Sequence, residues 1–399
     1  MRRTDSASSP RNRAVTDARA WLIHAAFAVC AGALSGGRFL SDERERAASI
    51  APNIDGASPW AGEIVSREVA LPPPLDTVRF TDCASAQEAW RFEGRTRDQL
   101  ASLAREAQLS DAAARSLLDG ARCDARGCTV APSAALLDAL TPSSRAALYP
   151  ELARHAANRE HVDPSLRPLS LGTWSDDPDL SPRVAMLLAK GTWSTGRHYA
   201  FSDTAWLCGR LPDAGDRLAA LRALRTRYSL DAWVRAPTAT DVDAMVAYWG
   251  RGREGETRAL LEGARARRGR VSVASLLPPM ARARLGRYPT ADEPLSDGFW
   301  TAAHLFDASP PTPERMGASA MRALLGERYR EVPLMAGRYG DVLALYDATG
   351  ELEQTASLVA VDLVFIKDGD ERSDPWVLEH LSSLLARHRF VTPRLWRSR

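Results

Sequence analysis

The sequence predicts an α+β fold, with an N-terminal helical region, a mixed middle domain and a C-terminal module of one helix followed by an antiparallel sheet. Helix-capping signals dominate residues 81–165, helix and strand signals mix over residues 166–275, and short apolar runs separated by turns follow residue 340. The chain has 399 residues, enough for roughly two or three domains. Its 45% hydrophobic and 26% charged residues exclude collagen-like, coiled-coil and wholly disordered classes.

Residues 1–37 have the pattern of a signal peptide or an N-terminal membrane anchor. Five arginines precede an uncharged stretch over residues 20–37, whose most apolar part is residues 21–33. That part matches a signal-peptide core and is shorter than the roughly 20 residues that span a bilayer. Cleavage near Ala31-Gly32-Ala33, an uncleaved anchor and a buried core helix remain open. Either of the first two makes the protein exported, so that its body is periplasmic or membrane-anchored outside the cytoplasm.

Cysteine usage is consistent with export. Cys30 lies in the apolar segment, and Cys83, Cys123, Cys128 and Cys208 remain after it. An even number suits disulfides in an oxidising compartment, and four cysteines allow three pairings, between which the sequence does not choose. A zinc site and free buried thiols are the alternatives.

Residues 38–80 are predicted to form a proline-rich linker, because prolines stand at positions 52, 59 and 72–74. Residues 81–165 are predicted to form a small helical domain. Ser110 precedes an alanine-rich run, and Thr141-Pro142 combines an N-cap with a proline at the first helical position.

Residues 166–275 are predicted to form a mixed α/β domain. Gly172-Thr173-Trp174-Ser175 recurs at residues 191–194, and the two tryptophans suit either core packing or sugar stacking. A capped helix is expected from Thr240 to Gly250. Residues 250–255 match a dinucleotide fingerprint but follow a helix instead of a strand, so we expect no such cofactor.

An arginine-rich stretch spans residues 251–287, where ten arginines face three glutamates for a local balance of +7. Arg265, Arg267, Arg268 and Arg270 form a candidate patch for a lipid head group or an acidic wall polymer. A solvated helix face is the alternative. The whole chain carries only +2, which argues against a nucleic-acid-coating protein.

The C-terminal residues 276–399 have the clearest pattern. A helix capped by Ser296 or Asp297 is expected to bury Trp300, Ala303 and Phe306. Strands are expected at residues 341–346, 354–361 and 363–367, and a further helix from residue 374.

Several phrases of this part resemble exported bacterial proteins with a C-terminal papain-like cysteine peptidase module of the NlpC type. They are residues 276–282, 288–290, 297–302, 340–342 and 364–369, with residues 241–243 and 248–250 upstream. The resemblance implies a papain-like module over residues 276–399 and an ancestral activity on cell-wall peptides. In that family a cysteine thiolate at a helix N-terminus works with a histidine on the adjoining strand.

This chain departs from the family at both positions, because Gly298 stands where the cysteine is expected and Gln354 where the histidine is expected. Since nucleophile and base act as a unit, the resemblance implies a degenerate, non-catalytic member. The groove beside these positions would be lined by five residues. They are Ser296, Asp297, Trp300, Gln354 and Lys367.

The resulting hypothesis is an exported or membrane-tethered envelope protein whose inactive papain-like domain binds or scaffolds. The alternatives are an active peptidase or amidase with a non-standard centre, such as Ser296 or Cys208 with His198, and a purely structural envelope component. Cell-wall peptide and anionic envelope polymer are the expected partners, with membrane association through residues 20–37 if that segment is uncleaved. No metal motif, cofactor motif or nucleic-acid partner is expected.

Overall fold

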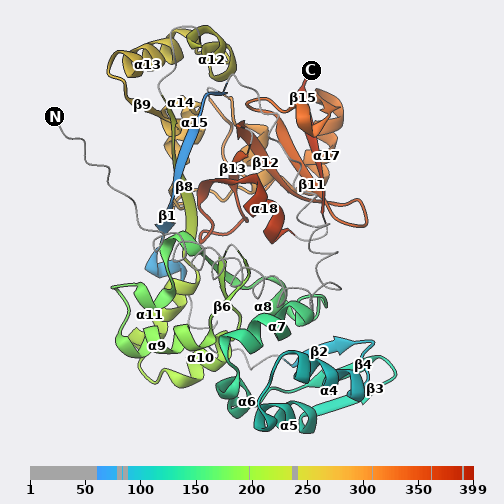
Figure 1. The fold of residues 1–399 in the computed structure, drawn as a ribbon. Coiled ribbons are helices and arrows are strands. Elements are labelled where there is room, and N and C mark those ends of the chain that lie inside the picture. The colour runs from blue at the N-terminus through green and yellow to red at the C-terminus, as the bar shows by residue number, and fades with distance from the viewer. Residues whose placement is uncertain are drawn as a thin grey trace, which may run out of the picture. The chain divides into compact units, whose positions relative to one another are not determined.

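The computed structural model describes residues 61–78, 83, 89–196, 198–235, 241–307, 309–360, 362–388 and 391–399. Within them the protein is α+β, as predicted, and its strands form four antiparallel sheets (Figure 1). The predicted signal or anchor segment, residues 1–37, and Cys30 lie outside the described residues.

The first sheet has the order β1-β8-β9, with β1 at Ile64–Leu71, β8 at Arg227–Arg235 and β9 at Arg270–Ser272. β1 therefore corrects the predicted linker over residues 38–80. The prolines at 72–74 end this strand instead of interrupting it, and its Ile-Val-Ser-Arg-Glu-Val-Ala-Leu sequence suits a half-buried strand. After it, η5 spans Leu75–Thr77.

The predicted helical region contains helices and also a sheet of order β2-β4-β3, which was not expected. Ser110 caps α5 and Thr141 caps α7 with Pro142 at its first position, as predicted. The strands are β2 (Trp90–Glu93), β3 (Ala121–Asp124) and β4 (Gly127–Val130). The helices are α4 (Arg97–Glu106), α5 (Asp111–Asp119), α6 (Ala134–Ala139), α7 (Pro142–Leu152) and α8 (Arg159–Val162).

The middle region mixes helices with a sheet of order β5-β7-β6. Trp174 and Trp193 are both buried, which confirms core packing for the repeated motif. The elements are β5 (Ser165–Pro168), η6 (Leu169–Leu171), η7 (Trp174–Asp176), α9 (Pro182–Gly191), β6 (Trp193–Ser194), β7 (His198–Phe201), α10 (Thr204–Arg210) and α11 (Ala214–Leu224).

Beyond β8, α12 (Val242–Trp249) ends at Gly250 as predicted, whereas Thr240 lies outside the described residues. Val242, Met245, Val246 and Trp249 form its buried face, again as predicted. The segment continues with α13 (Glu254–Ala266), α14 (Val273–Leu276) and α15 (Pro279–Arg284).

The C-terminal region consists of helices around a six-stranded sheet of order β10-β15-β11-β12-β13-β14. The three predicted strands are present, but the helix predicted from residue 374 was wrong: residues 376–380 form β14, and α18 begins only at Leu381. The helices are α16 (Gly298–Ala303), α17 (Gly317–Arg328), η8 (Leu334–Ala336) and α18 (Leu381–Arg387). The strands are β10 (Tyr329–Val332), β11 (Val342–Tyr346), β12 (Leu352–Ala360), β13 (Leu363–Lys367), β14 (Trp376–His380) and β15 (Thr392–Ser398).

Two large hydrophobic cores organise these elements. The first gathers buried side chains from residues 90–224 and so joins helices of the predicted helical and mixed regions. The second joins α12, α13 and the β1-β8-β9 sheet to α16, β12, β13 and β14. The predicted domain boundaries at residues 165 and 275 stay predictions.

The described cysteines form two disulfides, Cys83–Cys208 and Cys123–Cys128. Of the three pairings that the sequence allowed, the structure has this one. The second bond joins directly opposite residues of the β3–β4 hairpin, whereas the first closes a separation of 125 residues.

Candidate functional site

Gly298 and Gln354, the two positions singled out by the resemblance, lie against each other. Gly298 is the first residue of α16, and Gln354 lies on β12. A Cβ atom placed on Gly298 would lie 2.3 Å from Oε1 of Gln354. The Thr355 hydroxyl also donates to the carbonyl oxygen of Gly298, which fixes the helix start on the strand.

The backbone around Gly298 leaves no room for a side chain. Besides the contact with Gln354, a Cβ atom there would lie 2.8 Å from the carbonyl oxygen of Lys367 on β13. Gln354 is only 8% exposed, and its Oε1 accepts a hydrogen bond from the backbone N–H of Thr355. A thiol at position 298 would therefore require Gln354 to move.

Asp297 is the N-cap of α16. Its Oδ1 accepts from the backbone N–H of Trp300 at 2.7 Å, and its Oδ2 accepts from that of Gly317 at 2.8 Å. Asp297 thus joins the start of α16 to the start of α17. Ser296 is fully buried, and its hydroxyl has no hydrogen-bond partner among the described residues.

Trp300 belongs to the hydrophobic core. It is fully buried, and the Arg284 guanidinium lies 5.4 Å from the centroid of its ring and 5.2 Å from that of Trp376. The indole N–H of Trp376 donates to the Thr301 hydroxyl. These contacts join α16 to β14 and to the end of α15.

Lys367 is also fully buried. Its ammonium donates to the carbonyl oxygens of Gly369 and Glu371, at 3.0 and 3.1 Å, and lies 5.7 Å from the centroid of the Trp376 ring. Burial lowers the pKa of Lys367, although Asp374 and other nearby carboxylates oppose that shift. The lysine ties the turn after β13 to the sheet.

All five candidate groove residues are therefore interior residues, between 0 and 8% exposed. The Gln354 side chain and the Lys367 carbonyl oxygen lie where a side chain on residue 298 would stand. This packing corrects the expectation of a groove lined by these residues and favours a structural role for them.

Cys208 of the alternative centre and two C-terminal histidines are engaged in other interactions. Cys208 is bonded to Cys83, so its sulfur is no nucleophile for His198. His304 lies at the end of α16, where it contacts the Asp307 carboxylate at 2.6 Å. His380 similarly contacts the Asp362 carboxylate at 3.1 Å.

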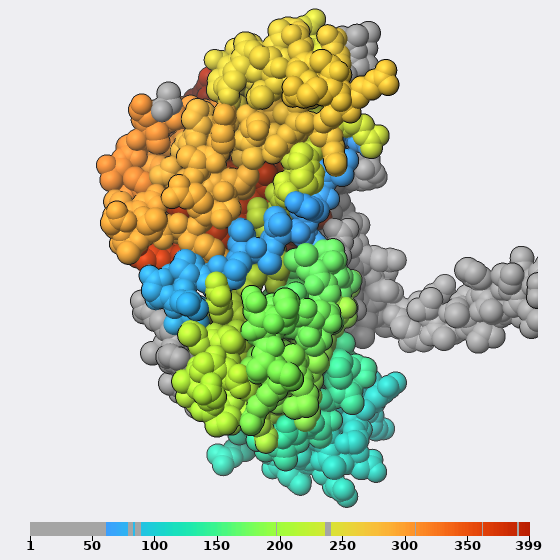
Figure 2. Space-filling view, turned by 90° about the vertical axis from the view of Figure 1, so that its left-hand side faces the viewer, coloured from blue at the N-terminus to red at the C-terminus, as the bar shows by residue number. Residues whose placement is uncertain are grey.

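The candidate anion patch lies on the surface, in the yellow segment of Figure 2. Arg265, Arg267 and Arg268 are exposed and have no ion pair among the described residues, whereas Arg270 lies 5.3 Å from the centroid of Trp233. Other arginines of this stretch are neutralised locally: Arg258 by Asp243, Arg282 by Glu256 and Arg284 by Glu293.

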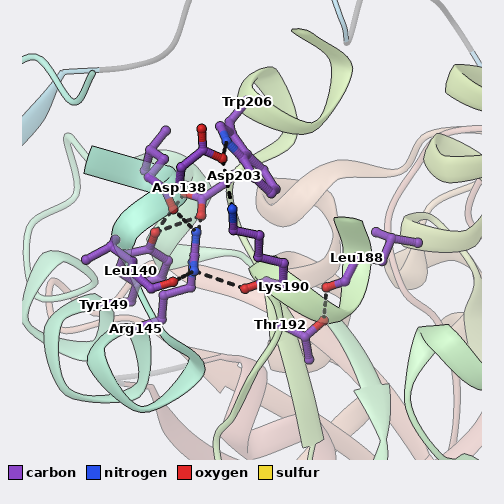
Figure 3. A network of polar contacts seen from close by, with 10 residues as sticks. Asp138, Leu140, Arg145, Tyr149, Leu188, Lys190, Thr192, Asp203 and Trp206 are labelled. Carbon is purple, nitrogen blue, oxygen red and sulfur yellow. Dashed lines mark hydrogen bonds and ion pairs between the residues drawn. The ribbon is translucent and has the colours of Figure 1, made fainter. Parts of the chain in front are cut away.

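Sequence reasoning missed a buried ion pair in the first core (Figure 3). The Arg145 guanidinium donates to Oδ2 of Asp203 at 3.0 Å and to the carbonyl oxygens of Leu137 and Lys190, and the Tyr149 hydroxyl donates to the same carboxylate. Burial raises the pKa of Asp203, and Arg145 and Tyr149 oppose the shift. Both charged side chains are fully buried, so this network connects α7 to the elements around α9 and α10 without access to solvent.

No helix among the described residues is long and apolar enough to cross a membrane. No protein-family model matches the chain, and neither a curated protein nor a solved structure matches it.

Proposed function

We propose that this is an exported or membrane-tethered envelope protein whose C-terminal part is a catalytically inactive papain-like domain used as a scaffold or for binding. The observation that carries the proposal is the contact between Gly298 and Gln354 at the junction of α16 and β12. Thiol catalysis of this kind needs a cysteine at a helix N-terminus that faces a histidine on a strand. Here Gly298 has only a hydrogen atom as its side chain, and Gln354 has an amide.

The close packing around this contact favours a structural role over a catalytic role for the residues at the start of α16. Restoring a nucleophile would require a thiol at residue 298, and the carbonyl oxygen of Lys367 and the side chain of Gln354 exclude it. The two disulfides support the export part of the proposal, since such bonds are rare in the reducing cytosol.

The proposal is tested by incubating the purified, folded full chain with peptidoglycan fragments and following peptide cleavage by mass spectrometry. We expect no cleavage above the protein-free control. Cleavage that disappears in Ser296→Ala or His304→Ala would overturn the proposal and establish a peptidase with a non-standard centre. Thermal melting of each variant shows that the chain is folded.

A structural envelope role is the second candidate, and the unpaired Arg265, Arg267 and Arg268 favour it. An arginine near an anionic membrane surface contributes about 1 kcal/mol of attraction. We expect salt-sensitive binding to vesicles containing phosphatidylglycerol and not to neutral vesicles, and weak binding after all three are changed to Glu. The matched control changes three exposed arginines elsewhere, Arg105, Arg115 and Arg122, to Glu. Equal binding by the two triple variants would eliminate this candidate.

A further inference from the structure

A cavity of about 520 Å³ lies away from the Gly298–Gln354 contact. Residues of β5, β8 and β14 line it, together with residues of α18 and of the turn that precedes β14. Its volume falls within the range of roughly 300–1,000 Å³ that is usual for small-molecule sites. None of the five candidate groove residues lines it.

One wall of the cavity carries a closed charge network. The Arg387 guanidinium donates to both carboxylate oxygens of Glu379, at 2.6 and 2.9 Å, and pairs with Asp368 at 2.9 Å. Burial alone would disfavour the Asp368 carboxylate, but Arg387 and His388 lower its pKa well below the ordinary value. These charges satisfy one another and leave little attraction for a ligand.

Other charged groups that line the cavity are not neutralised in this way. Among the described residues, the carboxylates of Asp163 and Glu371 have no hydrogen-bond or ion-pair partner. Arg227 forms an ion pair with Asp374 through Nη2 at 3.3 Å, and its side chain remains 44% exposed. The cavity therefore presents Arg227, Asp163 and Glu371 to whatever enters it, and Glu68 and Arg225 also line it.

Apolar side chains also contribute to the lining. Leu166 of β5, Leu230 of β8 and Val377 of β14 contribute to it, with Pro164 and Pro375. A lining with charged groups of both signs and several apolar side chains suits a small molecule that carries a positive end, a negative end and an apolar part.

We infer that this cavity binds a zwitterionic ligand, a free amino acid or a short peptide with free termini. Its carboxylate meets the Arg227 guanidinium, and its ammonium meets the Asp163 and Glu371 carboxylates. Arginine is suited to carboxylates because its planar fork of donors matches their geometry. The apolar residues of the lining receive the ligand's side chain. This inference does not rest on the papain-like proposal, because it concerns different residues.

Two simpler ligands fit less well. An inorganic anion would meet Arg227 but would lie near the unpaired Asp163, which is also close enough to act electrostatically on Arg227. A simple amine would meet the carboxylates but would offer nothing to the Arg227 guanidinium, whose side chain remains 44% exposed. A ligand with both charges satisfies both ends, and unpaired charges in a partly closed cavity are costly.

The test compares three probes by isothermal titration calorimetry with the full chain: L-alanyl-L-leucine, its N-acetyl derivative and its C-terminal amide. We expect the free dipeptide to bind and each blocked form to bind at least ~10-fold more weakly, because each has lost one charged hydrogen bond. Absence of dipeptide binding at millimolar concentration, or equal binding of the three probes, would overturn the inference.

Two variants then test which residue binds each charged end of the dipeptide. Arg227→Gln should bind the dipeptide and its amide equally, and Asp163→Asn should bind the dipeptide and its N-acetyl form equally. The matched control is Arg105→Gln with Glu106→Gln, exposed residues of α4 that line no part of the cavity. This control should bind the free dipeptide more tightly than the two blocked forms, as the unmodified chain does. Unchanged discrimination in both cavity variants would refute the assignment. Because the blocked probes are also tested on the unmodified chain, instability of Arg227→Gln does not affect the outcome.

Discussion

At the scale of single residues, the most informative position is Gly298, where any side chain would overlap neighbouring atoms. Changing Gly298 to Ala should lower the free energy of unfolding by about 1–3 kcal/mol, because the new methyl group overlaps Gln354 and the carbonyl oxygen of Lys367. Urea denaturation measures the change.

Gly326 in α17 is the matched control, since a Cβ atom there would meet nothing within 4 Å. Its replacement by Ala should instead stabilise the protein by about 0.5–1 kcal/mol through helix propensity. If the two alanine variants changed stability in the same direction, the close packing described at Gly298 would be incorrect.

His388 provides a residue-scale prediction of pH dependence. Burial opposes its protonation, but hydrogen bonds with Asp368 and Glu353 outweigh burial and raise its pKa. A pKa raised above the unfolded value near 6.5 means that protonated His388 stabilises the fold fully below about pH 6.5. That contribution is lost as the pH rises through the folded-state pKa.

We therefore expect His388→Gln to cost more stability at pH 6 than at pH 8.5, measured by urea denaturation of both proteins at both pH values. Taking the difference between the two proteins removes the titration of groups that they share. An equal cost at both pH values would contradict the raised pKa.

At the scale of elements, the buried pair between α7 and the segment before α10 is the contact most sensitive to change. Asp203→Asn leaves the Arg145 charge buried without a counter-charge, which should cost about 3–5 kcal/mol. The exposed pair of Asp243 and Arg258 is the control, and Asp243→Asn should cost about 0–1 kcal/mol. Similar losses in the two variants, by urea denaturation, would show that Asp203 is not the counter-charge that the fold requires.

Element prediction succeeded where local signals sufficed. The caps Ser110 and Thr141, the buried face of α12 and the strands β11 to β13 follow from side chains near in sequence. It failed at residues 376–380, where Pro375 suggested a helix start but the segment pairs with the edge of β13. Cross-strand partners 9 to 17 residues apart leave no local signal.

At the scale of the whole molecule, the two disulfides should contribute unequally. Cys83–Cys208 closes a separation of 125 residues and Cys123–Cys128 one of 5, so loop-closure entropy predicts contributions of about 5 and about 2 kcal/mol. Replacing both cysteines of the long-range bond by serine should therefore destabilise the chain more than the same change in the hairpin.

Urea denaturation without reductant measures the stability of both variants. Excess dithiothreitol provides the control, because reduction of the remaining disulfides should bring the unmodified protein and both variants to similar stability. A larger loss from the hairpin variant would show that this chain-entropy account does not hold here.

The sequence by itself determined the α+β class, the helix caps and the absence of cysteine after Cys208, and it suggested a pattern typical of export. These follow from residue types and near-neighbour spacing. Only the tertiary structure decided that residues 64–71 form a strand, that Arg145 lies buried beside Asp203, which disulfides form, and that the groove residues are packed. Apart from the hairpin bond Cys123–Cys128, these features depend on contacts between segments far apart in the chain, which form because the segments bury side chains against each other.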